Sequence, residues 1–184
     1  STLPNDNKRN VHQQNYSYSE AGNYTISMTD PNRNGGILNV NAPNSDQQAF
    51  HIETQFELSA TQNNHSPTLL LPPVDVAFVN QPFFHNPNGF DNDGDQLVYE
   101  LITPMQENGE SVDNYVMPTM ISPNPNNSLT LDANTGHLVW NSPQQEGEYN
   151  IAIKISEYRD GQLIGYAIRD MQILVLKEQV LPPT

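Results

Sequence analysis

Apolar and polar residues alternate with a period of two through much of this chain, and this period is typical of half-buried β-strands. The clearest case is residues 148–156, where Tyr149, Ile151, Ile153 and Ile155 fall on one face and the residues between them are mostly polar. No stretch shows the 3.6-residue period of an amphipathic helix. The pattern therefore predicts an all-β protein.

A hairpin follows this strand. Asp160 and Gly161 form the kind of dipeptide that closes a tight two-residue turn, and a return strand is expected over residues 163–176. Within that return strand the apolar positions change from even to odd numbers near Arg169 and Asp170. We expect a β-bulge there, because one extra residue would restore a single apolar face.

Weaker alternation predicts further strands, separated by turns rich in Asn, Asp, Gly and Pro. These strands are expected at residues 23–28, 37–40, 50–58, 74–79, 97–101, 128–131 and 137–140. Many short strands with polar turns are typical of antiparallel β-sandwiches, of which the immunoglobulin-like fold needs about 100 residues. The 184 residues fit two such units in tandem.

A polar stretch at residues 59–66, followed by Pro67, resembles a linker. We therefore expect a partial or first unit at residues 1–64 and a second, clearer unit at residues 65–184. Both contain a similar strand opening, GNYTI at residues 22–26 and GEYNI at residues 147–151. This similarity favours two related sandwich domains.

The composition narrows the function. The formal net charge of −14 argues against nucleic acid as a partner, and it argues equally against an anionic membrane surface. No apolar run is long enough for a membrane span, so no membrane insertion is expected. The absence of cysteine excludes disulfides and favours a bacterial source over a eukaryotic secreted one. No signal peptide opens the sequence, which we interpret as an internal piece of a longer chain.

The densest acidic segment is FDNDGD at residues 90–95, which places Asp91, Asp93 and Asp95 on alternate positions. Oxygen ligands on a short loop are what Ca²⁺ prefers. The segment is not an EF-hand, because position twelve of such a loop would be Ile102 in place of Glu. A solvated acidic turn is the alternative to a calcium site.

Several segments resemble known modules. Residues 91–101 (DNDGDQLVYEL), 131–140 (LDANTGHLVW) and 147–151 (GEYNI) resemble strands of cadherin-like and dystroglycan-type Ig-fold domains, a group that includes PKD-like modules. Other segments resemble modules in large surface proteins of gliding bacteria with type IX secretion; these are residues 30–34, 66–73, 157–161 and 168–172.

This resemblance implies tandem sandwich repeats on a bacterial cell surface, linked to adhesion, gliding motility or biofilm. It also implies a calcium site. Asp91 and Asp93 match the Asp-x-Asp loop of the cadherin-like family, Asp95 extends it, and Glu157 stands where that family has an acid on a late strand. The linker at residues 62–67 has no carboxylate, so a single ion or a weak site is expected.

Catalytic motifs are missing from the sequence, and we expect no enzyme: there is no Gly-x-Ser-x-Gly elbow, no phosphate-binding loop and no His pair at zinc-ligand spacing. The sequence predicts a non-catalytic, extracellular structural or adhesion module whose partners are neighbouring Ig-like domains and a surface glycan or protein ligand. A carbohydrate-binding module is the alternative. Its aromatic ligands would be Tyr115, in the long loop at residues 105–120, and Tyr158. The alternative for this loop is a solvated surface loop without a binding site.

Trp140 is expected to be a core anchor.

Overall fold

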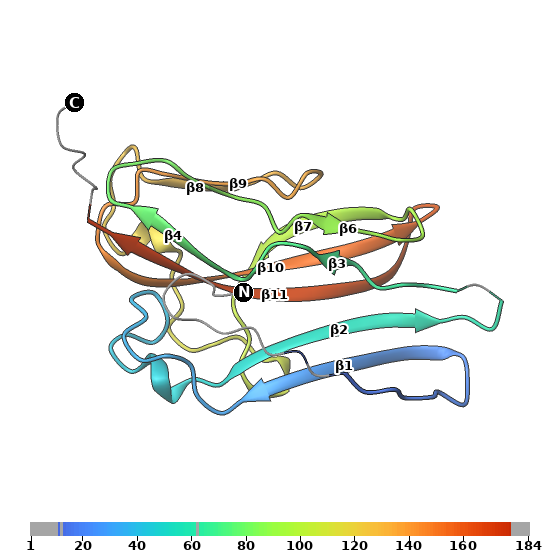
Figure 1. The fold of residues 1–184 in the computed structure, drawn as a ribbon. Helices are drawn as coiled ribbons and strands as arrows, with labels where there is room; N and C mark the ends of the chain where they lie inside the picture. The colour runs from blue at the N-terminus through green and yellow to red at the C-terminus, as the bar shows by residue number, and fades with distance from the viewer. Residues whose placement is uncertain (1–10, 12, 62, 178–184) are drawn as a thin grey trace.

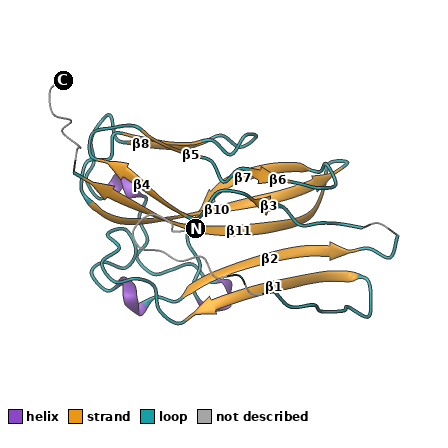
Figure 2. Cartoon of the chain, viewed as in Figure 1, coloured by secondary structure: helices purple, strands orange, loops and turns teal. Residues whose placement is uncertain are grey.

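The computed structural model describes residue 11, residues 13–61 and residues 63–177, and the chain is an all-β protein in this part (Figure 1). In chain order the strands are β1 (Gly22–Asp30), β2 (Phe50–Leu58), β3 (Thr68–Leu69), β4 (Val74–Phe78), β5 (Phe83–His85), β6 (Gly89–Phe90), β7 (Gln96–Ile102), β8 (Ser128–Leu131), β9 (Leu138–Asn141), β10 (Gly147–Arg159) and β11 (Gln162–Leu176). The helical content described is three single turns in the connections, η1 (Ser45–Gln47), η2 (Glu107–Gly109) and η3 (Pro118–Met120) (Figure 2).

The main sheet has the order β1-β2-β11-β10-β7, with antiparallel neighbours throughout. Its centre is the long β10–β11 hairpin, which the alternation and the Asp-Gly turn predicted. Asp160 and Gly161 take the positive φ values, 51° and 79°, that such a turn needs. One further strand, β4, runs parallel to the C-terminal half of β11.

A smaller antiparallel sheet, β5-β9-β8, lies over one face of the main sheet. The core between the two layers contains the alternating row from Tyr149 to Ile155, and each of these side chains is at most 1% exposed. Trp140 of β9 packs edge-on against Tyr149, with ring centroids 5.0 Å apart, and its indole N–H donates to Asn127 Oδ1 at 2.7 Å. The chain is an immunoglobulin-like β-sandwich, and Trp140 is the core anchor that was predicted.

Connecting segments cover the opposite face of the main sheet. The loop between β1 and β2 contributes Ile37 and Val40, and the long loop after β7 contributes Val112 and Tyr115. Together these four side chains form a second, smaller apolar cluster. The hairpin at the centre of the main sheet is therefore buried on both faces.

The observed strand pairing corrects two predictions made from the sequence. The expected bulge near Arg169 is wrong, because the register between β10 and β11 shifts between Glu157 and Tyr158 instead. The apolar residues of β11 change from even to odd positions because first one face of the strand and then the other is buried. The strand expected over residues 37–40 is also wrong, since Ile37 forms only an isolated parallel bridge to Glu148.

The segments on either side of the predicted domain boundary share one sheet. Strand β2 pairs with β11 through Phe56↔Gly165 and Thr54↔Ala167, and β1 continues the same sheet beyond β2. The polar stretch at residues 59–66 forms the connection from this hairpin to β3, with residue 62 outside the described part. The division into units at residue 64 stays a prediction.

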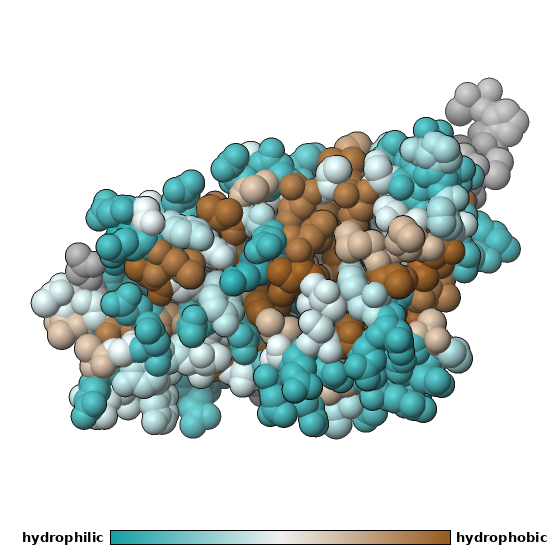
Figure 3. Space-filling view, turned by 180° about the vertical axis from the view of Figure 1, so that it is seen from behind, coloured by the Kyte–Doolittle hydropathy of each residue, from teal (hydrophilic) through white to brown (hydrophobic). Residues whose placement is uncertain are grey.

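On the face seen in Figure 3, hydrophobic side chains gather in patches across the middle of the molecule, with hydrophilic side chains around them. Ile26 and Met28 of β1 are 57% and 53% exposed, so these two apolar side chains lie at the surface and not in the core. Within the described residues, no helix is long and apolar enough to cross a membrane.

Candidate functional site

Three carboxylates from distant parts of the sequence meet at one end of the sandwich. Asp91 and Asp95 lie in the loop between β6 and β7, and Glu157 lies near the end of β10. One oxygen atom from each of the three lies within 4.8 Å of the others. This spacing is short enough for a single cation to contact all three.

The acidic loop is folded around Asp91. Its Oδ1 atom accepts hydrogen bonds from the backbone N–H groups of Asp93 and Asp95, each at 2.9 Å. Gly94 has a φ of 84°, a conformation that residues with a Cβ seldom adopt. These bonds engage Oδ1, whereas Oδ2 of Asp91 is buried and has no hydrogen-bond partner in the part of the chain that the structure describes.

The strand pattern explains why Glu157 points inward. It continues the odd-numbered row of Tyr149 to Ile155, so its side chain faces the interior of the sandwich. Opposite it on β11 stands Gly165, where an added Cβ would lie 2.7 Å from the Gln55 carbonyl oxygen and 3.2 Å from Glu157 Oε2. Glycine at this position thus leaves the room that the carboxylate occupies.

Glu157 is fully buried, and neither of its carboxylate oxygens has a hydrogen-bond partner within the described residues. Burial raises the pKa of this carboxyl to about 7. The Asn64 amide, which faces it without a bond of normal geometry, lowers the pKa in part, and the neighbouring Asp91 carboxylate raises it further. A buried anion without a partner is costly, so the site favours a proton or a cation.

Arg159 borders the cluster and neutralises one of its acids. Its guanidinium donates to both oxygens of Asp95, at 2.8 and 2.5 Å, in the paired geometry typical of strong Arg–carboxylate contacts. It also donates to Asn64 Oδ1 at 2.7 Å and to the Asn63 carbonyl at 3.2 Å. One side chain therefore ties the connection between β2 and β3 to the acidic loop.

Asp93, the fourth acid predicted as a ligand, contacts His65. One of its oxygens accepts the backbone N–H of His65 at 2.6 Å, and the other lies 3.0 Å from His65 Nδ1. These hydrogen bonds to His65 lower the pKa of Asp93. Of the four acids proposed from the sequence, the structure brings together Asp91, Asp95 and Glu157, whereas Asp93 fastens the connecting segment beside them.

Sequence reasoning missed Arg159, Asn64 and His65. A signal for Arg159 was present, because it stands two residues after Glu157 on the same strand, and residues two apart share a face. Asn64 and His65 are remote from the acidic loop in sequence, and only the folded chain places them against it.

The two predicted aromatic ligands lie far apart. Tyr115 belongs to the second apolar cluster, and its hydroxyl donates to the Asn150 carbonyl at 3.4 Å. Burial raises the pKa of Tyr115, as expected for a phenol removed from water. Tyr158 lies eight positions after Asn150 on β10, which is about 26 Å of extended strand. These tyrosines do not form one sugar-binding platform.

Comparisons with known proteins add little to this geometry. No family model matches the chain, and no curated protein matches it. Among solved structures it is similar to a Bacteroides fragilis protein provisionally assigned as an alpha-galactosidase, with 14% identity and a TM-score of 0.38 over 64% of this chain and 19% of the other. It is also similar to tandem immunoglobulin repeats of Dlar, with 11% identity and a TM-score of 0.32 over 70% of this chain and 63% of the other. The chain thus spans less than two thirds of either structure, and neither similarity says anything about activity.

Proposed function

We propose that this chain is a non-catalytic structural or adhesion module of a large bacterial surface protein, and that a calcium ion held by Asp91, Asp95 and Glu157 stabilises it. Its partners would be neighbouring Ig-like domains of the same polypeptide and a glycan or protein ligand at the cell surface. The single observation that carries this proposal is Glu157, fully buried, with both carboxylate oxygens unpaired and two further carboxylates beside it.

The donor atoms at this site fit a hard cation. Ca²⁺ binds oxygen ligands in flexible geometry, and three neighbouring carboxylates supply them here, of which Asp91 and Glu157 have unpaired oxygens among the described residues. Thiolate ligands are absent from the sequence, and the described cluster contains no imidazole, so the ligand set does not suit zinc. Because Arg159 already pairs with Asp95, the remaining negative charge suits one divalent ion and not a row of several.

A bound ion would also stiffen the end of the sandwich. Asp91 and Asp95 come from the loop before β7, Glu157 from β10, and Arg159 links the same loop to Asn63 and Asn64. An ion that binds the folded state alone stabilises it in proportion to the logarithm of its concentration over its dissociation constant. Such an ion suits a module that must hold its shape within an extended surface protein.

The first prediction is that millimolar calcium raises the unfolding temperature relative to EGTA. At 100 times the dissociation constant the gain in unfolding free energy is about 2.7 kcal/mol. We expect this rise to be lost in the double variant Asp91→Asn/Glu157→Gln, because both unpaired carboxylates are then neutral. Differential scanning calorimetry at fixed pH measures it.

The matched control is Glu110→Gln/Asp113→Asn, which neutralises two exposed acids of the loop after β7. It should keep the full calcium response, as the same charge is removed far from the cluster. If wild type shows neither a shift nor heat of binding in calorimetric titration with calcium, the calcium site is disproved. Magnesium in place of calcium should give a smaller shift, because Mg²⁺ demands stricter geometry.

A further inference from the structure

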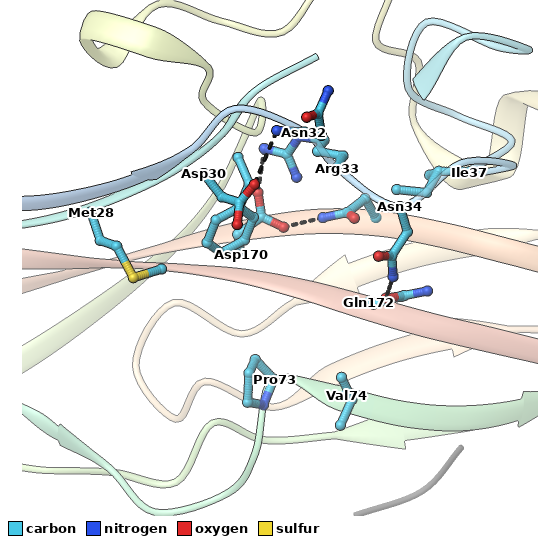
Figure 4. A pocket seen from close by; sticks show the side chains of 12 residues that line it. Met28, Asp30, Asn32, Arg33, Asn34, Ile37, Pro73, Val74, Asp170 and Gln172 are labelled. Atoms are coloured by element: carbon cyan, nitrogen blue, oxygen red, sulfur yellow. Dashed lines mark hydrogen bonds and ion pairs between the residues drawn. The ribbon is translucent and has the colours of Figure 1, made fainter. Parts of the chain in front are cut away.

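A second site lies on the other side of the molecule, where the main sheet splits. Strand β2 is paired with β11 only as far as Thr54↔Ala167, and β4 begins to pair with β11 at Gln172. Between these points the structure pairs no strand with this edge of β11 in its described residues. A hollow of about 290 Å³ opens there (Figure 4).

One part of the hollow is apolar. Met28 of β1 lies on one side of it, and Pro73 and Val74 lie on the other (Figure 4). Phe50 of β2 also lines the hollow. Met28 is 53% exposed, so this wall is open to solvent. These surfaces can hold an aliphatic chain.

The charged pair at the base of the hollow is already satisfied. Arg33 Nη2 lies 2.7 Å from Asp170 Oδ2, and the same guanidinium donates to the carbonyls of Ala49 and Met105. Asn150 donates to the other oxygen of Asp170. This pair therefore adds no free charge to the hollow.

The mouth, in contrast, offers acceptors. The Asn34 amide donates to Gln172 Oε1 at 2.9 Å, and the Asn32 amide donates to the Asp46 carbonyl at 2.7 Å. Asp30 accepts the Asn32 N–H through Oδ1 only. Each of these bonds uses one of the two N–H donors of its asparagine, and the side-chain oxygens of both asparagines and Asp30 Oδ2 are free among the described residues.

We propose that this groove binds a lysine or arginine side chain of a partner protein. The methylene stem lies along Met28, Phe50 and Val74, and the cationic head donates to Asp30 and to the free oxygen of Asn34. The free carboxylate of Asp30 and the acceptors around it favour a cationic group with several N–H donors. The apolar wall favours a side chain with a long methylene stem. The net charge of −14 steers basic partners towards this protein.

The probe is Nα-acetyl-L-lysine methylamide, titrated into ¹⁵N-labelled protein and followed by amide NMR shifts. We expect saturable shifts at Asn32, Asn34 and Val74, and none with the norleucine analogue, which has a similar stem without the charge. Asp30→Asn should weaken binding about two- to five-fold, since a pair at the rim contributes modestly. Asp113→Asn, a matched change at an exposed position outside the groove, should leave the affinity unchanged.

Asp30→Asn keeps the oxygen that accepts the Asn32 N–H, so the local fold is retained while the charge is removed. A second variant, Met28→Trp, narrows the groove at an exposed position and should also weaken binding. The proposal is overturned if lysine causes no shift, if norleucine binds as well as lysine, or if a neutral methyl glycoside shifts the same amides while lysine does not.

Discussion

Two buried acids on the same β-hairpin have opposite surroundings. Asp170 of β11 faces the covered side of the main sheet, where Arg33 forms an ion pair with one of its oxygens and Asn150 donates a hydrogen bond to the other. Glu157 of β10 faces the sandwich interior, where neither of its oxygens has a partner among the described residues. Burial raises the pKa of both carboxyls, and at Asp170 the Arg33 guanidinium opposes the rise.

The difference separates a structural site from a binding site. A buried carboxylate with a cation beside it already has its counter-charge. A buried carboxylate without partners is incomplete, and a cation from solution can complete it. The unpaired acid is therefore the better marker of function, although both acids are buried.

The largest effect is expected from breaking the satisfied pair. Arg33→Met leaves Asp170 buried without its cation, and we expect a loss of about 3–5 kcal/mol in unfolding free energy. Urea denaturation measures the loss. The double variant Arg33→Met/Asp170→Leu should recover much of it, because the uncompensated charge is then gone. Equal stability of the single and double variants would contradict this account.

A matched change at the other acid should have the opposite sign. Without calcium, at pH 8, Glu157→Gln should stabilise the protein by about 2 kcal/mol, because it removes a buried, unpaired charge and its amide can donate to Asp91. Asp170→Asn, the equivalent change at the paired acid, should destabilise it. Chemical denaturation in EGTA compares them. If both variants lose stability, Glu157 is as well accommodated as Asp170.

The pH dependence sharpens the comparison further. The folded pKa of Glu157, about 7, lies above its ordinary value of 4.5, so the folded state binds more protons between these two pH values. Stability in EGTA should therefore rise as the pH falls through 7, by about 1 kcal/mol between pH 8 and pH 6.5 from this group. Glu157→Gln should remove this part of the slope, and an unchanged slope would count against the assignment.

The smallest effect on stability is expected at the rim of the acidic cluster. Arg159→Gln removes the contacts that hold Asn63 and Asn64, so their backbone amides should exchange faster with deuterium. The unfolding temperature should change less than in the variants above, since Arg159 is partly exposed. Lys177→Gln, at an exposed ion pair with Glu146, is the control and should leave exchange at residues 63–64 as it is.

The sequence by itself determined the local structure. Alternation placed the β10–β11 hairpin, the Asp-Gly pair placed its turn, and Trp140 was recognised as a core residue. It also singled out Asp91, Asp95 and Glu157, partly through a family resemblance. These features could be predicted because a strand's side-chain period and a turn's dihedral angles depend on a few neighbouring residues.

Only the tertiary structure decided what lies on each face of the strands. The change from even to odd apolar positions in β11 indicated a bulge, but it arises because connecting loops bury the second face of the hairpin. This burial depends on residues more than 100 positions away, as in the contact between Asn39 and Asn150. The same holds for the acidic site: Asp93 turns to His65, and Arg159 reaches Asn64, because the connection after β2 crosses that end of the sandwich. Partners brought together by long-range packing leave no periodic trace in the sequence, so the groove beside Asp30 could be found only in the folded chain.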